Sequence, residues 1–115
     1  MKREIEFYES ENGKIPVQLF LDGLNERDFK KVSWVLRLIS ELTIIPSNYF
    51  KKLPDTNDIW EVIIDSGSDA FRILGFLHKN NIVLLTNGFQ KKTQKTPKKE
   101  IELAETLKKD YLRRK

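Results

Sequence analysis

The 115-residue chain has no cysteine and a single histidine, His78. It therefore has neither a disulfide framework nor a thiolate metal site, and one imidazole is a poor basis for a histidine metal site or a Ser-His-Asp triad. No apolar run approaches the roughly 20 residues of a membrane span, and Met1-Lys2-Arg3-Glu4 leads into charged alternation instead of a signal-peptide core. We expect a cytoplasmic protein with no metal, no cofactor and no membrane partner.

The net charge of +4 is distributed unevenly along the chain. Residues 91–115 hold ten Lys and Arg against four Asp and Glu, whereas residues 1–90 hold eleven against thirteen. A basic C-terminal part suits a polyanionic partner, although a solvated basic helix explains the same charges. With so little histidine, acid–base chemistry must come mostly from Lys, Arg, Glu, Asp or Tyr.

The first half of the chain predicts one strand and two helices. Period-two alternation favours a strand over Glu4–Glu9, at a sheet edge because of its charge. Pro16 is placed to begin a short amphipathic helix, and Asn25 is the expected N-cap of a second helix over Glu26–Leu42. The composition of residues 48–58 predicts turns.

The second half predicts three strands and a last helix, with Thr96 as the helix N-cap. The strands are expected at Ile59–Asp65, Ala70–His78 and Ile82–Phe89, the last two joined by a type I′ turn at Asn80-Asn81. Turns this short make the strands antiparallel. We therefore predict a single α+β domain over residues 1–115, in the order β-α-α-β-β-β-α. An antiparallel twisted sheet of about four strands would be packed by an N-terminal helical hairpin and a C-terminal helix.

The turn fixes a register for the central hairpin, with Arg72 opposite Phe89 and Leu74 opposite Asn87. Glu61 and Ile63 of the preceding strand join the face of Arg72 if the turn at residues 65–70 pairs its strands tightly. One face of the hairpin would then carry Arg72, Leu74, Phe76, His78, Val83, Leu85, Asn87 and Phe89. The other face is almost wholly apolar and should meet the helices, and both tryptophans are expected in the core.

Arg72 stands out because its strand is otherwise built from Phe, Ile, Leu and Gly. Two interpretations stay open: an ion pair with Glu61 or with the C-terminal helix, and an anion site in which the guanidinium holds a phosphate. Lys91 and Lys92, just after the hairpin, are either solvated loop lysines or part of the same anion site.

Several motifs together carry a family resemblance. They are Ile59-Trp60-Glu61-Val62, Phe71-Arg72-Ile73-Leu74, Leu84-Leu85, Gly88-Phe89 and Lys91-Lys92-Thr93-Gln94-Lys95-Thr96-Pro97. With them, the chain from Pro16-Val17 to Glu100–Leu112 resembles the phage-derived Gp49-like branch of HigB toxins, within the RelE superfamily. The basic run that ends in Thr96-Pro97 is the most specific part of the resemblance.

The resemblance implies a RelE-like toxin of a type II toxin–antitoxin pair. Such toxins cut mRNA, usually on the translating ribosome, and so inhibit translation and growth. The implied partner is a helix-turn-helix, HigA-like antitoxin. The pair would contact operator DNA only through this antitoxin. By motif position the family's strand arginine is Arg72 and its paired basic residues are Lys91 and Lys92. Many members carry His where this chain has Asn87.

Metal-independent RNA cleavage needs a base for the 2′-hydroxyl, a cation for the charge on phosphorus and an acid for the leaving 5′-oxygen. We assign the phosphate charge to Arg72, and the base or acid to Lys91 or Lys92, with Glu61 as a weaker candidate base. A second set of residues would bind the flanking RNA: Lys51, Lys52, Asn87, Lys95 and Lys98.

The alternative is a non-catalytic binding module that contacts RNA or the ribosome and an antitoxin without cleaving. The loss of an imidazole at Asn87 favours this alternative. A purely structural phage protein is a third interpretation, but it gives no reason for the basic residues to converge. The antitoxin is expected on the apolar surface of the helical hairpin or on an exposed strand edge.

Overall fold

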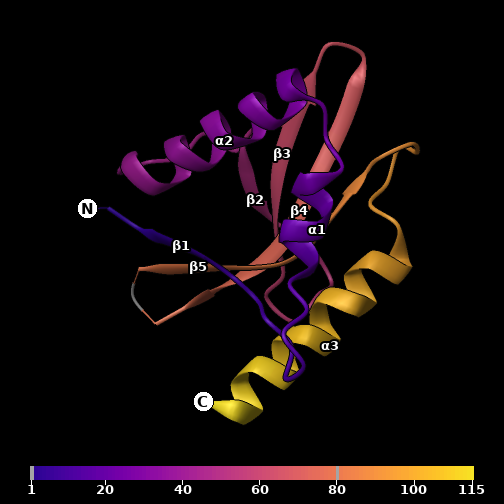
Figure 1. Cartoon of the computed structure of the whole chain (residues 1–115). Coiled ribbons are helices and arrows are strands. Elements are labelled where there is room, and N and C mark those ends of the chain that lie inside the picture. Colours follow the sequence, from indigo (N-terminus) through magenta and orange to yellow (C-terminus); the bar gives the residue numbers. More distant parts are fainter. Residues whose placement is uncertain (1, 80) are drawn as a thin grey trace.

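The computed structural model describes residues 2–79 and 81–115, so Met1 and Asn80 lie outside the described residues. In this part of the chain, five strands form one mixed sheet in the order β1-β5-β4-β3-β2, with three helices around it (Figure 1). The strands are β1 (Glu4–Phe7), β2 (Phe50–Lys52), β3 (Trp60–Ser66), β4 (Asp69–His78) and β5 (Ile82–Gln90). The helices are α1 (Pro16–Asp22), α2 (Glu26–Glu41) and α3 (Lys98–Arg114). None of the described helices is long and apolar enough to cross a membrane.

The α+β class is confirmed, and so is the antiparallel pairing of β3, β4 and β5. The predicted strand count and the wholly antiparallel sheet are wrong. β2 lies within residues 48–58, where only turns were expected, because a strand of three residues is too short to show alternation. β1 runs parallel to β5, which is possible because a long stretch of chain and no hairpin turn separates them.

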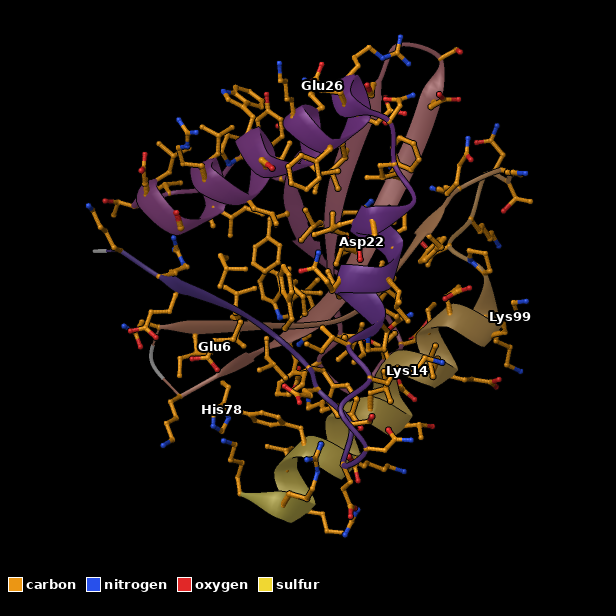
Figure 2. All side chains as sticks on the ribbon, in the orientation of Figure 1. Glu6, Lys14, Asp22, Glu26, His78 and Lys99 are labelled. Atoms are coloured by element: carbon orange, nitrogen blue, oxygen red, sulfur yellow. The ribbon has the colours of Figure 1, made fainter. Side chains whose placement is uncertain are left out.

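α1 and α2 begin where the sequence predicts and cover one face of the sheet. Asn25 caps α2, and its side chain accepts a hydrogen bond from the backbone N–H of Asp28 at 2.8 Å. Asp22 and Glu26, labelled in Figure 2, mark the short link between the two helices. The helices pack Val17, Leu21, Val32, Val35 and Ile39 against Val62, Ile64, Ile73, Val83 and Leu85 of the sheet.

α3 covers the opposite face of the sheet. Its residues Ala104, Leu107 and Tyr111 belong to clusters built on Leu74, Phe76 and Leu84. Since adjacent strand residues point to opposite faces, Leu84 contacts α3 while its neighbours Val83 and Leu85 contact the other two helices. The sheet is therefore enclosed on both sides.

A β-bulge changes the register of the central hairpin halfway along β5. Arg72 pairs with Phe89 as predicted, but beyond the bulge Gly75 pairs with Leu85. The extra residue is Thr86, whose hydroxyl oxygen lies 3.1 Å from the carbonyl oxygen of Leu74. The predicted placement of Val83 and Leu85 on the face of Arg72 is therefore wrong, and Leu84 takes that face. The predicted turn type at Asn80-Asn81 involves Asn80, outside the described residues.

Gly75 permits this bulge. A Cβ atom at this position would lie 2.3 Å from the carbonyl oxygen of Leu84, closer than any side chain tolerates. The half of the hairpin that carries Arg72 lies on the other side of the bulge and keeps its predicted register. The candidate site therefore depends only on the part of the hairpin that was predicted correctly.

Candidate functional site

Arg72 lies on β4 with its side chain 11% exposed. Its Nη1 atom donates a hydrogen bond to the carbonyl oxygen of Phe71 at 2.8 Å and lies 3.5 Å from Oδ1 of Asp65. Its Nε atom lies 3.9 Å from Oε1 of Glu61 and, within residues 2–79 and 81–115, has no hydrogen-bond partner. A buried N–H without an acceptor is unfavourable, so the Nε atom faces inward toward Glu61 and not toward a ligand; Arg72 also lines a surface pocket, where a ligand can meet it.

Glu61 connects Arg72 to the segment that follows β5. The Glu61 side chain is 2% exposed and makes the ion pair that the sequence left open for Arg72. Its second carboxylate oxygen accepts a hydrogen bond from the hydroxyl of Thr96. Thr96 is therefore not the N-cap of α3, because that helix begins at Lys98 with no side-chain cap. Sequence reasoning missed this role of Thr96, although the residue stands inside the basic run that carries the family resemblance.

The basic loop, residues 91–97, forms one wall of each of two pockets, and Lys91 lines both of them. The first, of about 700 Å³, lies over Arg72 and is lined by Ser68, Asp69, Ala70, Arg72, Gln90, Lys91, Lys92, Thr93 and Gln94. The second, of about 390 Å³, lies over Glu61 and is lined by Lys51, Leu53, Pro54, Glu61, Lys91, Gln94, Lys95, Thr96 and Ile101. The backbone N–H of Lys91 donates to the carbonyl oxygen of Ala70 at 2.7 Å, which ties the start of the loop to β4.

β2 decides which of the more distant lysines reach these pockets. Lys51 pairs directly with Glu61 across β2 and β3 and so joins Lys91 and Lys95 in the second pocket. Lys52 does not reach the pockets: its ammonium lies 2.7 Å from the carboxylate of Asp58 and lowers the pKa of Asp58 through a hydrogen bond and charge attraction. Lys98 is exposed at the start of α3 and lines neither pocket.

Asn87 is held inside the structure and is 3% exposed. Its Nδ2 atom donates to the backbone oxygen of Glu100 at 3.2 Å and to the Glu100 carboxylate at 3.1 Å. Its Oδ1 atom accepts a hydrogen bond from the hydroxyl of Thr86 at 2.6 Å. The amide therefore fixes the start of α3 and has no free donor to offer a ligand.

The charges around the two pockets suit a phosphate-bearing ligand. One guanidinium and four lysines line the two pockets, together with the carboxylates of Glu61 and Asp69. Guanidinium and ammonium groups bind phosphate oxygens through charge-assisted hydrogen bonds, and lysine can also transfer a proton. In the described residues, no three or more of the His, Cys, Asp and Glu side chains gather as a group that could hold a metal ion.

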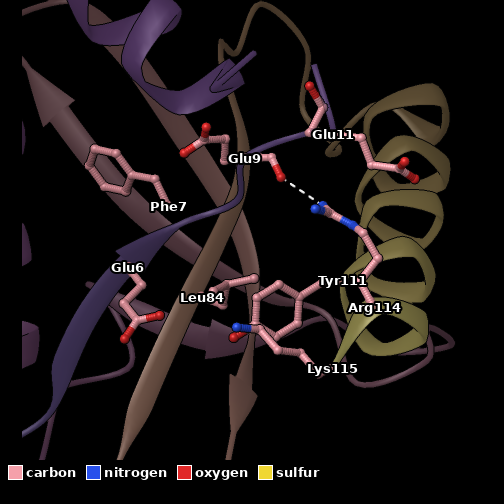
Figure 3. Close-up of a pocket in the computed structure, with 9 residues that line it drawn as sticks. Glu6, Phe7, Glu9, Glu11, Leu84, Tyr111, Arg114 and Lys115 are labelled. Atoms are coloured by element: carbon pink, nitrogen blue, oxygen red, sulfur yellow. Dashed lines mark hydrogen bonds between the residues drawn. The ribbon is translucent and has the colours of Figure 1, made fainter. Parts of the chain in front are cut away.

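A different pocket, of about 450 Å³, lies between β1 and the end of α3 (Figure 3). Arg114 donates there to the backbone oxygen of Glu9 at 2.6 Å. The lining also includes Glu6 and Glu11, whose carboxylates repel phosphate. For an anionic ligand, the pockets over Arg72 and Glu61 are therefore the better site.

The family model for phage derived protein Gp49-like (DUF891) matches residues 19–109, which include Glu61, Arg72 and the whole basic loop. No curated protein matched the chain.

Proposed function

Since the chain belongs to the phage-derived Gp49-like protein family, we propose that it is the toxin of a type II toxin–antitoxin system and a metal-independent mRNA endoribonuclease. The family is commonly related to toxin–antitoxin systems and is associated with RelE-type toxins. The observation that carries the proposal is the convergence of Arg72, Lys91 and Lys92 on one basic pocket. The toxin cuts mRNA on the translating ribosome and so inhibits translation and growth.

In this proposal Arg72 binds the scissile phosphate. Its position on a central strand and its contacts with Phe71 and Glu61 hold the guanidinium before any ligand arrives. A preorganised cation stabilises the charge that develops on the phosphoryl oxygens without reorganising during the reaction. The exposed counter-ion Asp65 is displaced when the phosphate binds, because its side chain is 70% exposed and gains full hydration on leaving.

Lys91 and Lys92 carry the proton transfers. One takes the proton of the 2′-hydroxyl, the 2′-oxygen bonds to phosphorus, and the bond from phosphorus to the 5′-oxygen breaks. The other donates a proton to that 5′-oxygen, which leaves a 2′,3′-cyclic phosphate and a 5′-hydroxyl end. Glu61 remains the weaker candidate base, because its two oxygens are already engaged by Arg72 and Thr96.

The surrounding lysines bind the phosphates on either side of the cleaved bond. Lys51 and Lys95 line the second pocket, so they extend the basic surface away from Arg72. Lys98 contributes from the start of α3, and Lys52 contributes only if it leaves Asp58. Binding through such contacts weakens as salt rises, because each neutralised phosphate releases counterions.

The proposed protein partner is a helix-turn-helix, HigA-like antitoxin that blocks the toxin and links it to operator DNA. A toxin–antitoxin pairing is the expectation for this family. Two surfaces suit such a partner: exposed apolar side chains such as Leu19 on the helical hairpin, and the free outer edge of β2 or β1.

A second candidate function is a binding module that occupies RNA or the ribosome without cleaving. Two observations favour it: Asn87 supplies no imidazole and is buried, and the Glu61 carboxylate is not free to act as a base. Such a protein would stop translation and leave the mRNA intact.

Purified protein added to a bacterial translation extract with a reporter mRNA separates these functions. The proposal predicts new 5′-hydroxyl ends within the reading frame of the reporter mRNA. Inhibition of translation with an intact reporter would overturn the endoribonuclease and favour the binding module. The Arg72→Ala variant serves as the inactive control.

A further inference from the structure

The outward face of α2 carries a line of basic side chains around an exposed tryptophan. We call this set the α2 stripe: Arg27, Lys30, Lys31, Trp34 and Arg37. Trp34 is 42% exposed, so the expectation that both tryptophans lie in the core is wrong for this one. Trp60, by contrast, is partly buried and stacks on Phe50 at 4.8 Å between ring centroids.

Helical spacing explains why these residues share a face. Residues three, four and seven apart lie above one another along an α-helix, and the stripe follows that spacing from Arg27 to Arg37. The opposite side of α2 buries Asp28, Val32, Val35 and Ile39 against the sheet. On the solvent side of α2, the Trp34 ring is 42% exposed, so part of its surface is open to a ligand.

The Trp34 ring is held in place and surrounded by positive charge. The Tyr49 ring meets it edge-on, with centroids 5.7 Å apart, and the Lys31 ammonium lies 4.7 Å from the Trp34 ring centroid. Within residues 2–79 and 81–115, no carboxylate lies at ion-pairing distance from Lys30, Lys31 or Arg37. Their charges are available to a ligand.

The α2 stripe begins at the rim of the Arg72 pocket. Arg27 lies 3.7 Å from the carboxylate of Asp69, and Asp69 lines that pocket. Glu26, beside Arg27, is labelled in Figure 2 near the turn between β3 and β4. From Arg27 to Arg37 the helix rises by about 15 Å. The stripe therefore extends away from the pocket over the length of a short single-stranded RNA segment.

We propose that the α2 stripe is a second RNA subsite, which binds the single-stranded segment flanking the phosphate at Arg72 and stacks one unpaired base on Trp34. This inference rests on the proposed function. Base stacking on aromatic side chains within a cationic groove is the usual chemistry of single-strand binding. A protein partner is a poorer match, because charged residues are depleted at the centres of protein–protein interfaces and four of the five stripe residues are cationic.

The test measures fluorescence anisotropy of labelled 2′-O-methyl oligoribonucleotides, which cannot be cleaved by attack of a 2′-hydroxyl. One probe has about three nucleotides and fills only the Arg72 pocket; the other has about twelve and can also reach the stripe. Trp34→Leu is expected to weaken binding of the long probe about fivefold or more and leave the short probe unchanged. The double variant Lys30→Gln/Arg37→Gln is expected to reduce the salt slope for the long probe by about 1.4.

Matched controls separate the stripe from general effects on fold or charge. Phe29→Leu changes another exposed aromatic of α2, and Lys14→Gln/Lys109→Gln removes the same charge elsewhere; both should bind like the wild type. If Trp34→Leu does not fold, the charge variant alone decides, since its two side chains are exposed.

Two results would overturn the inference, and they differ. Wild-type protein that binds neither probe would remove the RNA function and the subsite together. Wild-type protein that binds the long probe more tightly, with unchanged affinity in both stripe variants, would remove only the subsite. In that second case, the α2 stripe would instead be assigned to a protein partner.

Discussion

The Nε atom of Arg72 lies 3.9 Å from Oε1 of Glu61, and both side chains are nearly buried. At that separation the carboxylate attracts the guanidinium but makes no hydrogen bond to its buried Nε atom. The pair therefore holds Arg72 in place from the inner side. The side chain is still 11% exposed and lines a pocket, so one arginine can be part of the sheet and also meet a phosphate.

Asp65 competes with a phosphate for Arg72, because its carboxylate lies 3.5 Å from Nη1 on the exposed side. We predict that Asp65→Asn tightens binding of a short 2′-O-methyl oligoribonucleotide by about threefold, as expected for loss of one weak, exposed ion pair. Asp55→Asn, at an exposed position away from the Arg72 pocket, should have no effect. Unchanged affinity in Asp65→Asn would mean that Asp65 does not limit access to Arg72.

We expect Glu61 to serve mainly by holding Arg72 and Thr96 in place, and less through its negative charge. Glu61→Gln keeps an oxygen to accept from Thr96 and should fold, with cleavage reduced less than in Arg72→Ala. Glu61→Ala removes that acceptor and leaves the largely buried Arg72 without its partner, which should cost about 3 kcal/mol of unfolding free energy. Urea denaturation and cleavage assays on both variants test this. Loss of all cleavage in a stable Glu61→Gln protein would instead assign Glu61 the role of base.

Asn87 is expected to contribute stability. Asn87→Ala removes two hydrogen bonds to Glu100 and the acceptor for Thr86, so we predict a loss of about 2 kcal/mol in unfolding free energy. Asn48→Ala, at an exposed position, is the matched control. If Asn87→Ala is as stable as the control but loses RNA affinity, then Asn87 contacts RNA.

Asp28 links stability to acid pH. Its pKa is lowered chiefly by the hydrogen bond from the hydroxyl of Ser66, at 2.7 Å, with help from Arg27. A carboxyl whose folded pKa is depressed stabilises the fold above its unfolded value of 3.8 and loses that contribution as pH falls through the folded pKa. We predict unfolding free energy that decreases with acidification below about pH 4, with a shallower slope in Asp28→Asn. Equal slopes in urea melts of both proteins would contradict this.

The sequence predicted the part of the site that depends on local pattern. Arg72 and Glu61 share a face because short turns at both ends of β4 impose antiparallel pairing. Arg72 pairs with Phe89 as predicted only because the bulge offsets the register beside the turn, where His78 pairs with Ile82, one residue off the prediction. The helix starts at Pro16 and Asn25 were also predicted, because capping chemistry is local.

What escaped prediction depends on contacts between distant segments. β2 exists because β3 offers it an edge, and this pairing alone brings Lys51 beside Glu61. The bulge at Thr86 results from close backbone approach at Gly75, which alternation does not reveal. Thr96 was expected to cap α3, but the helix begins only at Lys98, and the Thr96 hydroxyl donates instead to Glu61 from a strand far away in the sequence.

The most direct test of the central claim is induced expression in a bacterial host with 5′-end mapping of RNA that includes 5′-hydroxyl ends, wild type beside Arg72→Ala. The proposed mechanism predicts growth arrest and new ends inside translated frames for the wild type, with both lost in a folded Arg72→Ala protein. New ends that persist in the folded variant would contradict the role of Arg72. Growth arrest of the wild type without new ends would contradict the endoribonuclease itself.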